Sequence, residues 1–407
     1  MKHINQKRRQ FIKATAVSTT LAATGFPAFL RAQPASIKIG LIHPVTGFLQ
    51  FSGSQCRFGA QLAIDEVNAA GGIKSMGGAK LQSVLGDAQS KPEVGAQEVE
   101  KMAGEGVAAI VGAYSSGIST ATTQAAAKHG TPHVVDVGVS DKIVQRGLTN
   151  TFRFGPGFGV IAKAGVERLI KLNEDAGKPI KTVAIVHENT TPFGSGIAKL
   201  MTNGVTEAGF EVLETLGHPS PNRDFNNIVL KIKAANPDLV IPSNYYNEYV
   251  LLSRTMHRQR VQPKAIYSVL GGAASQYKFL KEFPEAAQYI MDCNHWFNAK
   301  NPKALEVRQA TRDAGKFFNY EVFLAYTALM FIVDGLERAG SADQEKLTEA
   351  LSTSTWEGHI MPYGATKIVA GQNTGAMPLN TQILGDEIEV IMPEEFATAK
   401  AAFPRPA

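Results

Sequence analysis

Two adjacent serines follow directly on a short apolar run in the sequence IVGAYSSGIS, residues 110–119. The segment around Ser115 differs by one small substitution from G-x-S-x-G, the pattern that exposes the nucleophile of many serine hydrolases. It also stands between an expected strand and an expected helix, as that pattern requires. Such an enzyme needs an acid and a histidine at other strand ends, and the chain offers Asp292, His187 and His295.

The same two serines also suit a binding role. Serine is among the best residues at the start of a helix, where backbone N–H groups are unpaired and point outward. Such a helix end attracts carboxylates and other acceptor-rich groups. No His-Gly-Gly oxyanion segment precedes the serines. We therefore favour binding at Ser116 and keep a hydrolase that uses Ser115 as the alternative from another class.

Metal and nucleotide chemistry have little support. His129 and His133 are near ligand spacing, but Gly130 and Pro132 interrupt any helix between them. The chain has no G-x-x-x-x-G-K-[ST] sequence, and GPGFG at 155–159 lacks the spacing of a dinucleotide-binding loop. We predict no metal site and no cofactor.

Charge is distributed unevenly along the 407 residues, whose formal net charge is +5. Residues 1–33 hold six basic residues and no acidic one, which leaves 35 basic and 36 acidic residues in the remainder. A remainder so close to neutral predicts no nucleic-acid partner. Its length and its share of hydrophobic residues predict a globular protein with two domains of ~150 residues each.

The first 33 residues have the features of a bacterial export signal. Arg8 and Arg9 precede Phe11 and a mildly apolar stretch rich in Ala and Thr, which resembles a twin-arginine signal peptide. The stretch is too short for a membrane anchor, which needs ~20 strongly apolar residues. We expect cleavage near residues 32–35 and release into the periplasm. Cys56 and Cys293 are expected in different domains, as buried free thiols.

Strands and helices alternate along the chain. The first series has strands at 36–44, 79–87, 107–113 and 132–138, and helices at 57–72, 90–106 and 116–130. The second has strands at 182–188, 210–217, 238–243, 265–271 and 289–297, and helices at 160–176, 194–208, 224–235, 246–260 and 274–283. Further helices are expected at 303–314, 318–339 and 343–353. This alternation predicts an α/β fold with two doubly wound parallel-sheet lobes.

Small polar and aromatic residues gather at the ends of these strands. They are Pro44–Phe48, Tyr114–Ser116, Gly138–Asp141, His187–Asn189, Ser243–Tyr246 and Leu270–Gly272. Ligands of open parallel sheets bind at the carboxyl ends of strands. If the two lobes face each other, these segments converge on one cleft.

The sequence resembles the type I periplasmic solute-binding proteins of the branched-chain amino acid ABC transporter class. The resemblance covers nearly all residues after the signal and is carried by IKIGLIHPVTGFLQFSG, GAQLAIDEVNAAGGI, IVGAYSSGIS, FRFGPGFG and AYTALMFIVDGLERAGSAD. It implies two lobes joined by three crossing segments, which close around a small solute and present it to a membrane permease without catalysis. We place the lobes at 36–154 plus 296–358 and 155–295 plus 359–400, and expect a monomer.

The resemblance also implies ligand positions. The serine that holds the ligand carboxylate in amino-acid receptors matches Ser116, with Ser115 beside it. Aromatic positions match Phe51 in the first loop, Phe193 at a second-lobe helix start, and the pair Tyr245 and Tyr246 on the hinge side. With Tyr114, these rings are expected to line the cavity.

Two positions depart from the amino-acid receptors. Gly138 and Val139 stand where those receptors carry a threonine after a small residue, and Leu270 stands where they carry the acid that binds the α-ammonium group. A buried ammonium without an anionic partner is strongly disfavoured. We therefore predict a carboxylate or amide with an apolar or aromatic body. A branched-chain amino acid is the alternative, if Asp136 or Asp141 replaces the missing acid.

Overall fold

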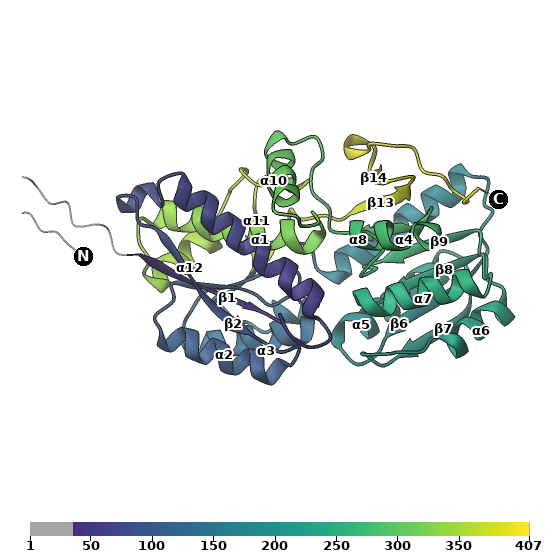
Figure 1. Ribbon diagram of the computed structural model, residues 1–407, viewed down its shortest axis with the longest axis horizontal. Coiled ribbons are helices and arrows are strands. Elements are labelled where there is room, and N and C mark those ends of the chain that lie inside the picture. The colour runs from purple at the N-terminus through teal and green to yellow at the C-terminus, as the bar shows by residue number, and fades with distance from the viewer. Residues whose placement is uncertain (1–35, 407) are drawn as a thin grey trace, which may run out of the picture. The chain divides into compact units, whose positions relative to one another are not determined.

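Two seven-stranded sheets with flanking helices make up residues 36–406, the part of the chain that the computed structural model describes (Figure 1). The predicted export signal with Arg8 and Arg9 lies outside these residues. Each sheet, with its helices, forms one lobe. This confirms the predicted architecture of two doubly wound α/β lobes.

The first sheet has the strand order β11-β12-β5-β4-β3-β1-β2. Its strands are β1 Ile37–His43, β2 Leu81–Asp87, β3 Ala109–Gly112, β4 His133–Val135, β5 Thr151–Arg153, β11 Ile368–Val369 and β12 Gln372–Asn373. The five strands β1 to β5 pair in parallel. A parallel sheet is covered on both faces, and the apolar run of β3 is accordingly buried throughout.

Helices cover both faces of this first sheet. They are α1 Gln50–Ala69, α2 Pro92–Gly104, α3 Ser116–Lys128, α11 Tyr320–Ala339 and α12 Gln344–Ser352. Figure 1 shows α2 and α3 below the strands and α1 and α11 above them. The helices α1 and α11 pack closely because α1 has a glycine at the contact: a Cβ on Gly59 would lie 2.2 Å from the carbonyl oxygen of Val322.

The second sheet has the order β14-β13-β10-β9-β8-β6-β7. Its strands are β6 Thr182–Glu188, β7 Glu211–His218, β8 Leu239–Ser243, β9 Ala265–Val269, β10 Met291–Asn294, β13 Leu379–Leu384 and β14 Glu387–Met392. The helices of this part of the chain are α4 Phe158–Asp175, which precedes β6, and α5 Pro192–Glu207, α6 Asn226–Ala235, α7 Tyr246–Arg258, α8 Tyr277–Glu282 and α9 Pro284–Ala287, which follow its strands. Helix α10, Pro302–Asp313, follows β10.

The chain passes between the two sheets three times, after β5, after β10 and after β12. Both sheets are parallel except at one edge, where β11 and β12 form one antiparallel pair and β13 pairs antiparallel with β10 and β14. Sheet pairing therefore puts β11 and β12 in the first sheet, whereas the sequence placed residues 359–400 in the second lobe. The sequence assigns segments to lobes by the alternation of strands and helices. Short antiparallel strands such as β11 and β12 do not show this alternation, so the sequence cannot place them.

The first helix begins earlier than the predicted range of 57–72. It starts at Gln50, and the residue before it, Leu49, makes no side-chain capping bond. Its first turns lie against the end of β1, where a Cβ on Gly53 would be 2.1 Å from the carbonyl oxygen of Pro44. Tertiary packing sets this helix start, and no capping residue in the sequence marks it.

The two cysteines lie in different lobes, as expected from the sequence. Cys56 and Cys293 are both buried and both free. Burial raises the pKa of each thiol, to about 12 for Cys293. Among the described residues, no helix combines the length and the apolar character needed to cross a membrane.

Candidate ligand-binding site

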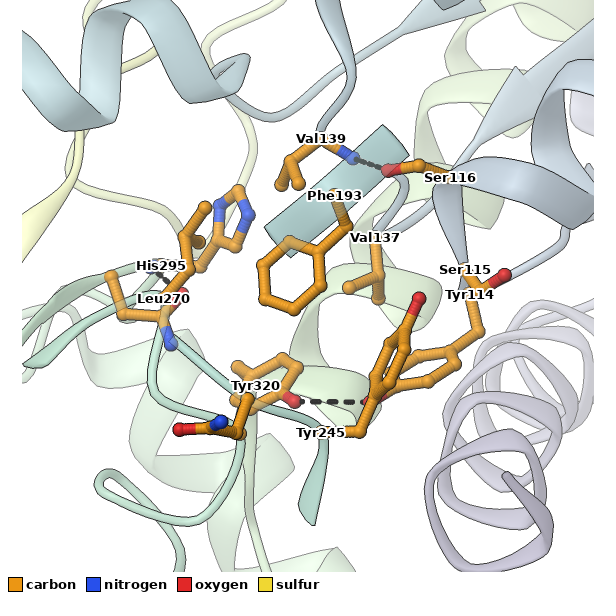
Figure 2. Close-up of a pocket in the computed structure, with 13 residues that line it drawn as sticks. Tyr114, Ser115, Ser116, Val137, Val139, Phe193, Tyr245, Leu270, His295 and Tyr320 are labelled. Carbon is orange, nitrogen blue, oxygen red and sulfur yellow. Dashed lines mark hydrogen bonds between the residues drawn. The ribbon is translucent and has the colours of Figure 1, made fainter. Parts of the chain in front are cut away.

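A cavity with about 380 Å³ of empty space lies between the strand ends of the two lobes (Figure 2). The residues that line it are Tyr114, Ser115, Ser116, Val137, Val139, Phe193, Asn244, Tyr245, Leu270, Gly272, Asn294, His295 and Tyr320. Most of the lining follows the carboxyl ends of parallel strands, where ligands of such sheets bind.

The start of α3 forms one wall of the cavity. Ser115 is the N-cap residue, and its side-chain oxygen accepts a bond from the Ile118 N–H at 3.4 Å. The Ser116 Oγ accepts bonds from the N–H groups of Val139 at 3.2 Å and Ser140 at 3.1 Å. These bonds occupy the acceptor positions of the Ser116 hydroxyl, so its hydrogen is left to donate to a ligand.

Tyr114 is held in place by a buried acid. Its backbone has a positive φ of 63°, and its N–H donates to Asp136 Oδ1 at 2.9 Å. Asp136 also accepts from the Val137 N–H at 2.7 Å and pairs with His43 Nε2 at 3.0 Å. Burial raises the pKa of Asp136, but these bonds outweigh burial and leave the pKa below its ordinary value. Asp136 therefore fixes the backbone before α3 and does not line the cavity.

Asp141, the other candidate for an ammonium-binding acid, is also engaged elsewhere. Its Oδ1 pairs with Arg153 at 2.9 Å, and its Oδ2 accepts from the Gly159 N–H at 3.1 Å. These bonds tie the segment after β4 to the last residue of β5 and to the first turn of α4. Neither Asp136 nor Asp141 is among the residues that line the cavity.

Aromatic rings form much of the remaining wall. The ring of Tyr245 lies 5.2 Å from that of Phe193 and 6.2 Å from that of Tyr114, measured between centroids. The Tyr245 hydroxyl pairs with Thr191 Oγ1 at 3.2 Å, and the hydroxyls of Tyr114 and Tyr320 lie 3.4 Å apart. Rings held in this way present apolar faces while their polar ends remain bonded to the protein.

The two departures noted in the sequence place apolar side chains in the cavity. Val139 and Leu270 both line it, and Figure 2 shows their side chains near the ring of His295. Leu270 has a positive φ of 56° and is held by a bond from its N–H to the Cys293 carbonyl at 3.1 Å. Among the lining residues of the described chain there is no Asp, Glu, Lys or Arg.

Three of the ten residues proposed from the sequence lie outside the lining. The ring of Phe51, on α1, lies 4.4 Å from that of Tyr246, on α7, so this pair joins the two lobes beside the cavity. Gly138 lies behind α3, where a Cβ would be 2.6 Å from the Ser119 Oγ. The other seven line the cavity, and their contact with a ligand remains a prediction.

Six lining residues were not proposed as ligand-binding positions: Val137, Asn244, Gly272, Asn294, His295 and Tyr320. Asn244 and Gly272 belong to strand-end groups that the sequence analysis names, so their place in the lining could be predicted from the sequence. Tyr320 begins α11, far along the chain from α3, and no local pattern connects it with the site.

The hydrogen bonds of the hydrolase candidates do not form a catalytic triad. No bond joins Ser115 to a histidine within residues 36–406, and His187 Nδ1 bonds to the Glu188 carbonyl oxygen at 2.8 Å. Asp292 accepts from the Gly271 N–H and the Ser275 hydroxyl, and it bonds to no histidine of the described chain. Catalysis by Ser115 is therefore unsupported.

The histidines considered as metal ligands have separate partners. His129 pairs with Glu100, and His133 Nε2 pairs with the Thr122 hydroxyl at 3.1 Å. A different group in the described chain, formed by His43, Cys56 and Asp136, brings three possible metal-ligating atoms within 4.8 Å of one another. This group is fully buried, and its His43–Asp136 bond already belongs to the network behind Tyr114.

The profile of the periplasmic binding protein family matches residues 36–382. The chain belongs to the periplasmic binding protein family. Its relatives include a Leu/Ile/Val-binding protein homologue of Brucella suis biovar 1, 27% identical over 402 residues, which cover 95% of this chain and 97% of the relative. The predicted resemblance is therefore confirmed.

Solved structures share the fold of this family member. A branched-chain amino acid transporter substrate binding protein of Streptococcus pneumoniae, in complex with isoleucine, superposes with a TM-score of 0.74 at 22% identity, covering 88% of this chain and 100% of its own. An ABC transporter solute binding protein of Rhodopseudomonas palustris BisB5, in complex with 3,4-dihydroxybenzoic acid, has a TM-score of 0.72 at 18% identity and covers 89% and 94%.

Proposed function

We propose that this protein is the receptor of an ABC importer and that it captures a small carboxylate or amide with an apolar or aromatic body. The cavity supplies a helix N-terminus and the Ser116 hydroxyl at one wall, aromatic rings around the body, and no charged side chain. The observation that carries the proposal is this uncharged lining, with Val139 and Leu270 where amino-acid receptors carry polar anchors.

The physical reason is the cost of burying charge. A carboxylate can be held by the N–H groups and hydroxyl at the start of α3, because the helix dipole and these donors favour negative charge. An α-ammonium group needs an anionic partner, because burying its charge without one costs several kcal/mol. Asp136 and Asp141 are both occupied by other partners. An uncharged or anionic ligand therefore fits better than a zwitterion.

A branched-chain amino acid is the alternative ligand, and relatives of this chain favour it. One relative is a Leu/Ile/Val-binding protein homologue, and solved structures of this fold hold isoleucine in one case and an aromatic acid in another. The fold is thus compatible with both ligand classes, and the choice between them rests on the lining residues of this chain.

Calorimetric titration of matched pairs tests the ligand class. Each pair consists of an amino acid and its deaminated acid, for example leucine with 4-methylpentanoate and phenylalanine with 3-phenylpropanoate. We expect the acid to bind about tenfold tighter or better, equivalent to ~1.4 kcal/mol. Equal or tighter binding of leucine, isoleucine or valine would overturn the proposal and favour the amino-acid receptor.

We further propose that the protein is exported to the periplasm by the twin-arginine route and acts there as a monomer that delivers its ligand to a membrane permease. Its family and the basic, acid-free first 33 residues support export. Replacing Arg8 and Arg9 with lysine should retain the full-length precursor in the cytoplasm. Unchanged recovery from the periplasm would remove the twin-arginine route while leaving the receptor function intact.

The receptor is also proposed to act without catalysis. The bonds of Ser115, His187 and Asp292 support this because they form no charge-relay arrangement. A serine-reactive phosphonate is expected to leave the purified protein unlabelled. Stoichiometric labelling of Ser115 would instead favour the hydrolase alternative.

A further inference from the structure

His295 is the first residue after β10, and it differs from the other buried histidines of the described chain. Its side chain lines the cavity and is 2% exposed, yet neither ring nitrogen has a hydrogen-bond partner within residues 36–406. Each other buried histidine has at least one ring nitrogen bonded: His43, His133, His218 and His359. Buried polar atoms without partners are uncommon in proteins, because each lowers the stability of the fold.

The His295 ring is neutral in this environment. Burial, together with the nearby positive charge of Arg153, lowers its pKa to about 3. A neutral imidazole has one nitrogen that donates a hydrogen bond and one that accepts. The unpaired nitrogens of His295 therefore suit a group that can donate or accept, and a hydroxyl can do both.

A second residue of the cavity lining also has an unpaired polar atom. Asn244 lines the cavity with no exposed surface, and its Oδ1 has no partner among the described residues. Its amide nitrogen is engaged with His218 Nε2. Because Oδ1 only accepts hydrogen bonds, it calls for a donor on the ligand. Together with His295, this favours a hydroxyl over a carbonyl, while an ammonium donor would have no anionic partner in the lining.

His295 lies across the cavity from the wall formed by the start of α3. Figure 2 shows His295 and Leu270 on one side of the Phe193 ring, and Tyr114 and Ser115 on the other. A ligand held by its carboxylate at the start of α3 therefore extends its body past Phe193 toward His295. A polar group on the far end of that body would meet the unpaired ring.

We propose that His295 is a ligand-binding residue that pairs with a hydroxyl on the body of the bound acid, and that Asn244 Oδ1 accepts a hydrogen bond from the same ligand. The ligand class is then a hydroxy-substituted carboxylic acid or amide. This inference rests on the proposed receptor function and adds a second polar recognition point to the one at Ser116.

Calorimetry on the purified protein tests this with acids that differ by one hydroxyl, namely benzoate against 3- and 4-hydroxybenzoate and hexanoate against 5-hydroxyhexanoate. The wild-type protein should bind at least one hydroxy acid about tenfold tighter than its parent, as expected for a site with unpaired polar groups. His295→Phe should reduce that preference to about threefold or less while parent-acid affinity is kept or improved. His295→Asn, which keeps a donor and an acceptor, should retain part of the preference.

A matched control is His359→Phe, which alters a similarly buried histidine outside the cavity lining and should leave the hydroxyl preference unchanged. If the acids bind but none gains from a hydroxyl, the inference about His295 fails and the receptor proposal stands. If His295→Phe weakens parent and hydroxy acids equally, His295 does not read the hydroxyl. If no acid binds the wild-type protein, the proposed function itself fails, and with it the inference.

Discussion

The two sides of the cavity differ in how their polar atoms are satisfied. On the first-lobe side, the Ser116 Oγ accepts two backbone N–H bonds and the Tyr114 N–H is bound by Asp136. At the second-lobe strand ends, the Asn244 Oδ1 and both nitrogens of His295 have no partner in the described chain. The first side is built before any ligand arrives, whereas the second has groups left to pair with one.

This difference suggests that one lobe contributes general affinity for acids and the other contributes selectivity among them. A preorganised wall binds a group that many ligands share, since it loses little freedom on binding. Unpaired polar groups discriminate strongly, because a ligand without the matching group leaves them unsatisfied. We therefore expect the α3 wall to determine how tightly acids bind in general, and the Asn244 and His295 side to determine which acid binds.

The largest effect is expected at the shared wall. Ser116→Ala removes the hydroxyl whose hydrogen is free to donate, so binding of every carboxylate should weaken by ~1–3 kcal/mol, as for a lost bond to a charged group. Calorimetry on several acids measures this loss. Thr120→Ala is the matched control, because Thr120 bonds to the Ser116 carbonyl and lies outside the lining. Loss restricted to a single acid would contradict a shared wall.

A charge placed on the opposite side should change the ligand class. Leu270→Glu introduces an anion at the lining position that amino-acid receptors use for the ammonium group. The affinity ratio of 4-methylpentanoate to leucine should fall by about tenfold, since the ammonium gains a partner. Leu270→Gln controls for shape without charge and should shift the ratio less. A ratio unchanged in Leu270→Glu would show that the ammonium seat is elsewhere.

A smaller effect, equal for all ligands, is expected where the lobes touch beside the cavity. Phe51→Ala removes the ring that packs on Tyr246 at 4.4 Å. Aromatic pairs contribute about 0.5–1.5 kcal/mol, so affinity should drop by roughly 2- to 13-fold for every acid tested. Phe51→Tyr keeps the ring and should behave as wild type. A change in the order of preference among acids would place Phe51 in recognition instead.

The smallest effect concerns pH. The pKa of His295 is lowered to about 3 by burial and by Arg153, so the ring stays neutral above roughly pH 5. The ratio of wild-type to His295→Asn dissociation constants should therefore stay constant between about pH 5.5 and pH 8. Titrations across this range measure it, and other ionising groups cancel in the ratio. A wild-type advantage that grows as the pH falls would show that binding protonates His295.

Much of the fold could be predicted from local patterns. The strand at Thr182–Glu188 was predicted with the same bounds, and most other strands and helices lie within a few residues of their predicted ranges. Apolar runs buried on both faces and helices between them leave few alternatives to a doubly wound sheet. The start of α1 and the sheet of β11 and β12 were not predictable in this way, because packing against distant segments decides both.

The sequence by itself determined the α3 wall, because Ser115 and Ser116 follow their strand directly and strand-to-helix geometry is local. Only the tertiary structure decided what faces that wall. Asp136 looked available for a ligand, yet it lies beneath Tyr114 and bonds to His43 and two backbone N–H groups. The sequence offers His295 as a candidate catalytic histidine, yet its buried ring lines the cavity and has no hydrogen-bond partner in the described chain. Spacing along the chain sets neither outcome, because the partners of a buried polar atom depend on segments that only folding brings together.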